Sequence, residues 1–216
     1  PPRSTLFPYT TLFRSENRPY SAFIAITRGC NRFCAYCIVP YVRGREISRD
    51  ATDIVAEAKM LAASGVREIM LLGQNVAAYG WGGNVNPPPD DVSPFADLLA
   101  ELVRIDGLKR IRFTSPYPTY FNAKLIRIMA EHPQICRNVH LPLQSGSDAV
   151  LKAMNRHYTA AQYCAIVDAL RAAMPEITFS TDVIVGFPGE TEADFLATRA
   201  VMNRVGFDNA YIFKYS

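Results

Sequence analysis

Apolar residues along the chain alternate between short continuous runs and longer stretches with helical spacing. The runs are typical of strands covered on both faces, and the stretches repeat apolar residues every third or fourth position. The pattern predicts six strands, at Ser21–Thr27, Arg67–Leu72, Lys109–Thr114, Asn138–Leu143, Ile177–Val185 and Asn209–Ser216. It predicts helices at Asp50–Ser64, Phe95–Ile105, Ala123–Glu131, Asp148–Met154, Ala160–Ala173 and Glu192–Arg204.

This alternation predicts an α/β fold whose parallel strands are joined by right-handed crossovers. Six units are too few for a closed barrel of eight, so we expect an open partial (β/α)6 barrel of the TIM type. A doubly wound open sheet is the structural alternative. In either fold ligands bind beyond the carboxyl ends of the strands. Polar or glycine-rich segments follow four predicted strands there, at Gly29–Cys37, Gly73–Val76, Gln144–Ser147 and Gly186–Glu190.

The first fifteen residues do not fit this pattern. Pro1–Ser15 has no capping signal and no hydrophobic period, and most of it reads like the translation of a sequencing-adapter oligonucleotide. We therefore expect an adapter-derived or disordered tail at residues 1–15 and one domain at residues 16–216. The chain has a formal net charge of +3, and the tail holds Arg3 and Arg14 without an acidic residue, so the rest is close to neutral.

Composition and charge restrict the classes of protein to which the chain can belong. The chain has 216 residues, of which 49% are hydrophobic, enough for one domain with a sizeable core. It contains no apolar run long enough to cross a bilayer, so we expect no membrane partner. The near-neutral charge offers no basic stripe for nucleic acid. Three of five cysteines crowd into one segment, which argues against a secreted disulfide framework and favours a reducing cytoplasm.

The candidate chemistry lies in GCNRFCAYC, which places Cys30, Cys34 and Cys37 at the spacing C-x3-C-x2-C. Three thiolates on one loop can hold three irons of a [4Fe–4S] cluster, whereas electron-transfer clusters usually have four cysteine ligands. The fourth iron would stay open to another molecule. The alternative is a zinc ion with a remote fourth ligand, for which His140 and Cys136 are candidates.

Further polar groups follow the other strands. A glycine at Gly73 permits close approach of backbone to a ligand, and Gln74 and Asn75 offer amide donors and acceptors, although a simple turn is the alternative. Gln144 and Ser145 are candidates to face a reaction chamber. Nearby hydroxyls have structural explanations. Ser147 is expected to be a helix N-cap, and Thr191 with Asp194 resembles a capping box.

The cysteine spacing, with Tyr36 before the third cysteine, resembles the motif of radical S-adenosylmethionine (SAM) enzymes. The resemblance implies that SAM chelates the open iron and that one electron then releases a 5′-deoxyadenosyl radical. It implies SAM contacts from Tyr36, from Gly73, Gln74 and Asn75 near the methionyl amino group, and from Gln144 and Ser145. Val185 and Gly186 are implied adenine contacts. Asp182 either points into the chamber or caps a neighbouring loop.

Most of the chain after Glu16 resembles one branch of that superfamily, the methylthiotransferases, and within it the tRNA enzymes of the MiaB type. The matching segments are GCNRFCAYCIVPYVRGREISR, LLGQNVAAYG, RIRFTSPYP, HLPLQSGSDAVLKAMNR, STDVIVGFPGETEADF and YIFKYS. Tyr117 is a departure, because a histidine is common at this position. The resemblance implies addition of a methylthio group to N6-dimethylallyladenosine next to the anticodon.

Full-length relatives of this type carry an upstream domain with a second [4Fe–4S] cluster and a downstream RNA-binding barrel. We therefore expect this chain to be a SAM-cleaving core that needs those domains to methylthiolate tRNA. A flavodoxin or ferredoxin is the expected electron donor. The alternatives are a methylthiotransferase acting on a ribosomal protein or on threonylcarbamoyladenosine in tRNA, and a non-enzymatic structural metal module.

Overall fold

Six parallel strands organise the protein in the computed structural model, which describes residues 20–82, 88–114 and 116–216. The expectation for Pro1–Ser15 falls outside the described residues. The strands are β1 (Ser21–Ala25), β4 (Glu68–Leu72), β5 (Arg110–Phe113), β6 (Asn138–His140), β7 (Thr178–Val185) and β8 (Asn209–Lys214). All six predicted strands are shorter at their ends in the structure.

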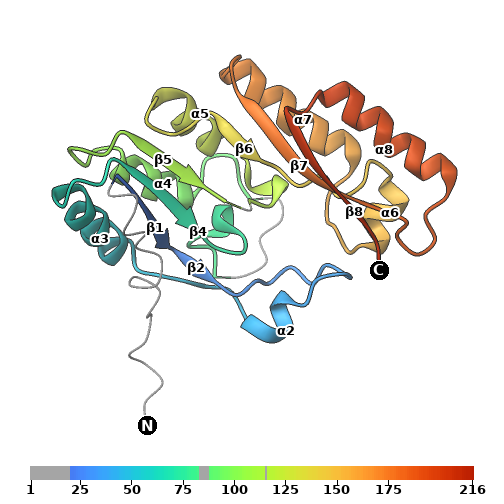
Figure 1. Cartoon of the computed structure of the whole chain (residues 1–216), viewed down its shortest axis with the longest axis horizontal. Helices are drawn as coiled ribbons and strands as arrows, with labels where there is room; N and C mark the ends of the chain where they lie inside the picture. Colours follow the sequence, from blue (N-terminus) through green and yellow to red (C-terminus); the bar gives the residue numbers. More distant parts are fainter. Residues whose placement is uncertain (1–19, 83–87, 115) are drawn as a thin grey trace, which may run out of the picture.

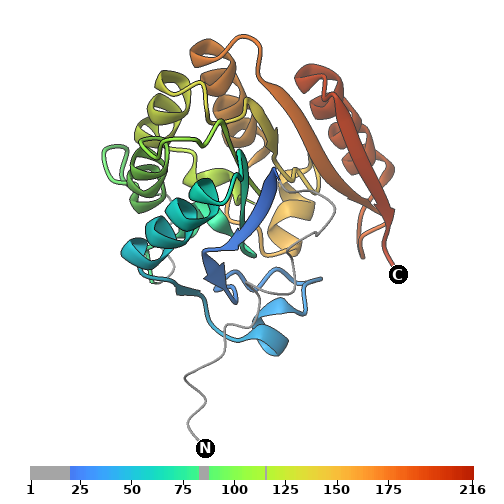
Figure 2. The same cartoon turned by 60° about the vertical axis from the view of Figure 1, so that its left-hand side comes forward.

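The strands lie side by side in chain order. β1 pairs with β4 and β4 with β5, while β6 pairs with β7 and β7 with β8, all in parallel. A parallel bridge between Ile111 and Ile135 connects the two groups. No reversal of strand order occurs among the described strands, which excludes the doubly wound alternative. Figures 1 and 2 show that the sheet is curved. The predicted partial barrel is therefore confirmed.

Helices cover the outer face of the sheet (Figures 1 and 2). They are α3 (Ala51–Ala63), α4 (Pro94–Leu102), α5 (Ala123–Glu131), α6 (Asp148–Ala153), α7 (Ala160–Ala173) and α8 (Glu192–Val205). Alternate strand residues such as Ile69 and Leu71 are fully buried against this layer. None of the helices in the described part of the chain is long and apolar enough to span a bilayer.

Helix starts follow the predicted capping chemistry. The Ser147 side chain accepts a hydrogen bond from the backbone N–H of Val150 and begins α6. Thr191 and Asp194 form a complete capping box at the start of α8. Both caps are therefore confirmed, and they satisfy backbone donors that a helix start otherwise leaves free.

The segment around the cysteines contains three short elements that the hydrophobic pattern did not predict. A two-residue strand β2 (Thr27–Arg28) pairs antiparallel with β3 (Ile47–Ser48), and α2 (Val39–Arg43) lies between them. The pairing of β2 with β3 joins the two ends of the segment that carries the three cysteines. Elements of two to five residues are too short to show a hydrophobic period, which explains why the sequence did not reveal them.

Helix α8 packs directly on the loop that follows β6. A Cβ atom on Gly146 would lie 2.6 Å from the Cα atom of Thr198 and 2.7 Å from the carbonyl oxygen of Ala197. The Gly146 N–H donates to Oγ1 of Thr198 at 2.9 Å. Only glycine allows this approach, and the resulting contact with α8 fixes the position of the loop that carries Gln144.

We predict that Gly146→Ala lowers the free energy of unfolding by about 1–3 kcal/mol, because the new methyl group meets the backbone of α8. Chemical denaturation measures the change. Ala200→Ser, on the exposed side of α8, adds one atom of similar size and should change stability by less than about 0.5 kcal/mol. Equal effects of the two substitutions would contradict the close packing of α8 on this loop.

Candidate active site

A cavity of about 180 Å³ lies where the loops after the strands meet. Its lining combines three thiols, two guanidinium groups, two phenols and three side-chain amides. It is formed by Cys30, Arg32, Cys34, Tyr36, Cys37, Gln74, Asn75, Pro116, Tyr117, Pro142, Gln144 and Arg156. Seven of the twelve residues that the sequence singled out for metal or cofactor binding are in this set. The convergence expected at the carboxyl ends of the strands is therefore present.

Backbone contacts give the cysteine loop its shape. Gly29 has a φ of 72°, and a Cβ atom there would lie 2.2 Å from the carbonyl oxygen of Arg45. The Cys30 N–H donates to the Gly44 carbonyl at 3.2 Å, and the Cys37 N–H donates to the Cys34 carbonyl at 2.9 Å. The loop therefore folds back on its own base and directs three thiols to one cavity.

The three thiols are free and mostly shielded from water. Cys30 and Cys34 are each 8% exposed, and Cys37 is half-buried. Burial raises the pKa of the Cys30 thiol, while the hydrogen bond that its sulfur accepts from the Arg32 N–H at 3.3 Å opposes this rise. A buried thiol is a poor nucleophile but becomes a strong ligand once a metal displaces its proton.

The arrangement fits an iron–sulfur cluster better than a zinc ion. Among the described residues, no three histidine, cysteine or acidic side chains converge on a point where one ion would sit. A zinc ion holds each thiolate at about 2.3 Å, whereas the cysteines of a [4Fe–4S] cluster bind separate irons. The two proposed fourth zinc ligands, His140 and Cys136, do not line the cavity.

Two amide atoms in the cavity have no hydrogen-bond partner among the residues that the structure describes. They are Oε1 of Gln74 and Nδ2 of Asn75, and both atoms are buried. The other amide atom of Asn75, Oδ1, accepts a hydrogen bond from the Tyr117 N–H at 3.0 Å. Because leaving a buried polar atom unpaired is costly, these two atoms indicate a ligand with a donor for Gln74 and an acceptor for Asn75.

Gln144 adopts a backbone conformation that is rare outside glycine. Its φ is 66°, and both its backbone N–H and its carbonyl bond to β7. The Gln144 N–H donates to the Asp182 carbonyl at 2.8 Å, and its own carbonyl accepts from the Ile184 N–H at 2.9 Å. Strained conformations of this kind cost about 1–3 kcal/mol and cluster at functional sites. The strain supports the predicted role of the Gln144 side chain.

The sequence did not identify two arginines that line the cavity. Arg156 donates to the Cys34 sulfur at 3.7 Å, to the Tyr36 hydroxyl at 3.4 Å and to the Pro142 carbonyl at 3.2 Å. Arg32 is 6% exposed and donates to the Tyr120 hydroxyl at 2.9 Å.

Buried arginines usually have carboxylate partners, and the charge of Arg32 does act on the carboxyl group of Glu46, which is 8% exposed. None of the Arg156 partners just named is a carboxylate. Burial by itself lowers the pKa of Arg156, but Tyr158, Tyr36 and Cys34 raise it well above its usual value, so the group stays charged. No sequence signal marks these arginines, because their contacts are made with residues of loops that are distant along the chain.

Gly73 and Ser145 lie next to the cavity but do not line it. A Cβ atom on Gly73 would lie 2.0 Å from Oγ1 of Thr27, so this glycine is required for packing between loops. Ser145 is fully buried, and its hydroxyl lies 3.1 Å from the Thr198 hydroxyl of α8. Both contacts explain these residues structurally, and a direct role in ligand binding stays a prediction.

The SAM contacts predicted on β7 and directly after it also lie outside the lining of the cysteine cavity. Oδ2 of Asp182 is 3.1 Å from Nε2 of His140, whose Nδ1 lies 2.9 Å from the Ser180 hydroxyl. Val185 is partly buried at the end of β7. Gly186, with a φ of 73°, begins a turn in which its N–H donates to the Glu190 carboxylate. The adenine contacts of Val185 and Gly186 stay a prediction.

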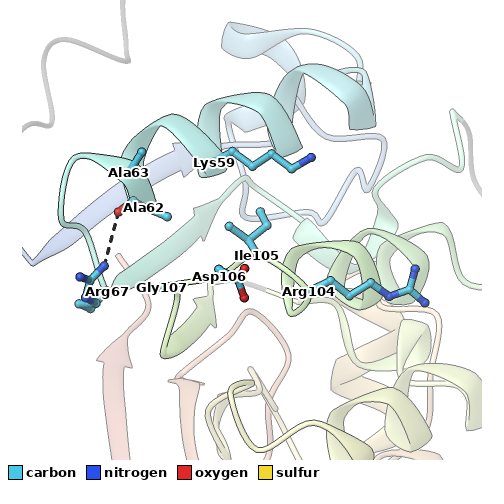
Figure 3. A pocket seen from close by; sticks show the side chains of 8 residues that line it. All are labelled: Lys59, Ala62, Ala63, Arg67, Arg104, Ile105, Asp106 and Gly107. Carbon is cyan, nitrogen blue, oxygen red and sulfur yellow. Dashed lines mark hydrogen bonds between the residues drawn. The ribbon is translucent and has the colours of Figure 1, made fainter.

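A second hollow, shown in Figure 3, lies at the opposite end of the strands. Its basic side chains do not converge: in this view those of Lys59 and Arg104 both extend to the right without meeting, and Arg67 bonds to the Ala62 carbonyl at 3.4 Å. This hollow therefore lacks the set of groups facing one point that the cysteine cavity has.

The sequence of this chain is similar to that of known radical SAM proteins. The model of the radical SAM superfamily matches residues 24–201. Two relatives named tRNA-2-methylthio-N(6)-dimethylallyladenosine synthase are each 50% identical, one from Mycobacterium avium over 96% of this chain and one from Dictyoglomus thermophilum over 95%. A third of that name, from Geobacter metallireducens, is 49% identical over 99% of the chain. The chain spans only 29%, 45% and 46% of these three proteins.

Solved structures give the same fold. The radical SAM methyltransferase TsrM from Kitasatospora setae aligns with a TM-score of 0.71 and 20% identity, over 91% of this chain and 36% of TsrM. The coproporphyrinogen III oxidase HemN from Escherichia coli aligns with a TM-score of 0.60 and 14% identity, over 91% of this chain and 44% of HemN. With the partial barrel and the family match over most of its length, the chain belongs to the radical SAM superfamily.

Proposed function

We propose that this chain is the SAM-cleaving core of a tRNA methylthiotransferase that adds a 2-methylthio group to N6-dimethylallyladenosine next to the anticodon. One observation carries the chemistry: three free cysteines from one loop share a cavity with two unpaired amide atoms and two arginines. The identity of about 50% to the synthases named above supports the substrate class.

The cavity residues fit both cofactors of this chemistry. Cys30, Cys34 and Cys37 would hold a [4Fe–4S] cluster, and the absence of a fourth cysteine from the lining leaves one iron for SAM. The unpaired Oε1 of Gln74 suits the amino group of SAM as an acceptor. Arg156 suits the SAM carboxylate, because the planar guanidinium fork matches a carboxylate in geometry and charge.

When bound, the cluster supplies the electron that cleaves a carbon–sulfur bond of SAM and so generates a 5′-deoxyadenosyl radical. The protein's part is to position the reactants and to exclude water, which would otherwise quench reactive species. Tyr36 contributes to that exclusion. It packs against the small apolar group of Val150, Met154, Ile184 and Phe187 beside the cysteine loop.

The whole reaction needs partners beyond this chain. We infer that the tRNA is held mainly by flanking domains of the kind that occur in longer relatives, where a second [4Fe–4S] cluster is also expected. A flavodoxin or ferredoxin is the proposed electron donor. Because the proposed substrate is tRNA, we place the reaction in the cytoplasm.

Replacing any one of Cys30, Cys34 and Cys37 by alanine should abolish bound iron and the formation of 5′-deoxyadenosine. Anaerobic reconstitution with iron and sulfide, followed by SAM and dithionite, provides the assay, with iron content and product measured on the same samples. Cys136→Ala and Cys164→Ala are the matched controls and should retain both. If the triple cysteine variant forms as much 5′-deoxyadenosine as wild type, the proposed chemistry is wrong.

Gln74→Ala should weaken SAM binding roughly tenfold without lowering the iron content, because it removes one hydrogen bond to a charged group. Calorimetry on the cluster-loaded protein measures the affinity. Gln134→Ala, a glutamine substitution that lies outside the cavity lining, is the control. Equal affinities of wild type and Gln74→Ala would remove Gln74 from the set of SAM contacts.

The substrate class is tested with a longer protein in which this core is joined to its flanking domains. We expect a mass increase corresponding to one methylthio group in an anticodon stem–loop that contains N6-dimethylallyladenosine. The same stem–loop with unmodified adenosine and a ribosomal-protein peptide serve as the comparison substrates. Methylthiolation of the peptide alone would refute the tRNA assignment while leaving the SAM chemistry intact.

A further inference from the structure

The segment that carries Arg156 is bonded directly to the cysteine loop. The Ala35 N–H donates to the Met154 carbonyl at 3.0 Å, and Nδ2 of Asn155 donates to the Phe33 carbonyl at 2.7 Å. Asn155 has a φ of 56°, a left-handed conformation that asparagine adopts more readily than most residues. The turn after α6 is therefore held against the loop, and this fixes where the Arg156 side chain begins.

One edge of the Arg156 guanidinium is anchored by neutral oxygens. Its Nε and Nη2 donate to the Tyr158 hydroxyl at 3.0 and 2.8 Å, and Nη2 also donates to the Pro142 carbonyl at 3.2 Å. The other terminal nitrogen, Nη1, donates to the Cys34 sulfur at 3.7 Å and to the Tyr36 hydroxyl at 3.4 Å. Because the guanidinium is planar and rigid, anchoring one edge holds Nη1 at the sulfur.

The positive charge of Arg156 has no acidic partner in the described part of the chain, where every ion pair joins other residues. The Tyr117 ring, whose centroid lies 4.5 Å from the Arg156 guanidinium carbon, attracts the cation without neutralising it. Arg32 lies at the same distance from this ring, but its charge acts on the buried carboxyl group of Glu46. The charge of Arg156 is left to act on phenols and on Cys34.

The sulfur atoms of the cysteine loop accept hydrogen bonds from different kinds of donor. The Cys30 sulfur accepts from the backbone N–H of Arg32 at 3.3 Å, which is a neutral group, whereas the Cys34 sulfur accepts from a cation. Hydrogen bonds to the sulfurs and the net charge of the site set the reduction potential of an iron–sulfur cluster. One-electron reduction adds a negative charge, which a nearby cation stabilises.

We propose that Arg156 is a positioning residue that holds one positive charge against the Cys34 sulfur and so raises the reduction potential of the cluster. The inference rests on the proposed function, which places a [4Fe–4S] cluster on the three cysteines, and adds to it the residue that tunes this cluster. A higher potential makes it easier for the flavodoxin or ferredoxin to deliver the single electron. The effect needs no bound SAM, so it can be measured on the chain that holds the cluster alone.

The test replaces Arg156 by glutamine, which removes the charge, and by lysine, which keeps it. The potential of the reconstituted cluster is measured without SAM by a redox titration monitored by EPR, and iron content is determined on the same samples. Arg156→Gln loses a hydrogen bond from a charged group, so reduction should become roughly tenfold less favourable, which lowers the one-electron potential by about 59 mV. Arg156→Lys should stay within about threefold of wild type.

Arg171→Gln is the matched control. Arg171 also lies over an aromatic ring, 5.3 Å from the Phe179 centroid, and donates to the Val205 carbonyl at 2.6 Å, but it is outside the cavity lining. Its replacement should leave the potential unchanged. A wild-type potential in Arg156→Gln would overturn the inference. An equal decrease in Arg156→Lys would also overturn it, because the charge would then not be the cause.

A measurement on the wild-type chain covers failure of Arg156→Gln to take up a cluster. The chain is produced with arginine labelled with nitrogen-15 in the guanidino group, and its reduced cluster is examined by pulsed EPR. We expect a nitrogen-15 coupling that disappears in Arg156→Lys, and absence of the coupling from wild type would refute the contact with Cys34. A wild-type chain that holds a cluster and cleaves SAM without the coupling refutes this inference alone. A wild-type chain that takes up no cluster refutes the proposed function itself.

Discussion

The parallel direction of the strands is the constraint on which the site depends. Because every strand of the partial barrel ends at the same edge, the loops after β1, β4, β5 and β6 meet there. None of these loops could form a binding site alone. Their meeting places thiols, amides, phenols and guanidinium groups from distant parts of the chain around one cavity.

The loops are held by structural contacts that take no part in chemistry. Gly29 lets the cysteine loop approach the Arg45 carbonyl, and Gly146 lets α8 approach the loop after β6. The clamp of β7 on the backbone of Gln144 has a similar effect, because it supports a conformation that would not persist in a free loop. Ser145, a predicted ligand contact, also supports this framework through its hydroxyl contact with Thr198 of α8.

The electrostatics of the cavity follow from burial. Burial raises the pKa of the Cys30 thiol there, while Arg156 stays charged and contacts neutral phenols and a carbonyl group. Such a site favours anionic ligands, since an anion relieves the cost of keeping the Arg156 cation poorly solvated. Three thiolates on a cluster and the carboxylate of SAM are the negative groups that the proposed function would bring to it.

The sequence by itself determined the strand–helix alternation, the cap at Ser147 and the three cysteines, because hydrophobic period, capping and ligand spacing are local properties. Because ligands bind beyond the carboxyl ends of parallel strands, the sequence also predicted Gln74, Asn75 and Gln144 at the correct edge of the sheet. Tertiary structure alone revealed Arg32, Arg156 and their shared ring at Tyr117. The contacts of these residues join positions up to 122 residues apart, as between Cys34 and Arg156, and only the folded sheet brings them together.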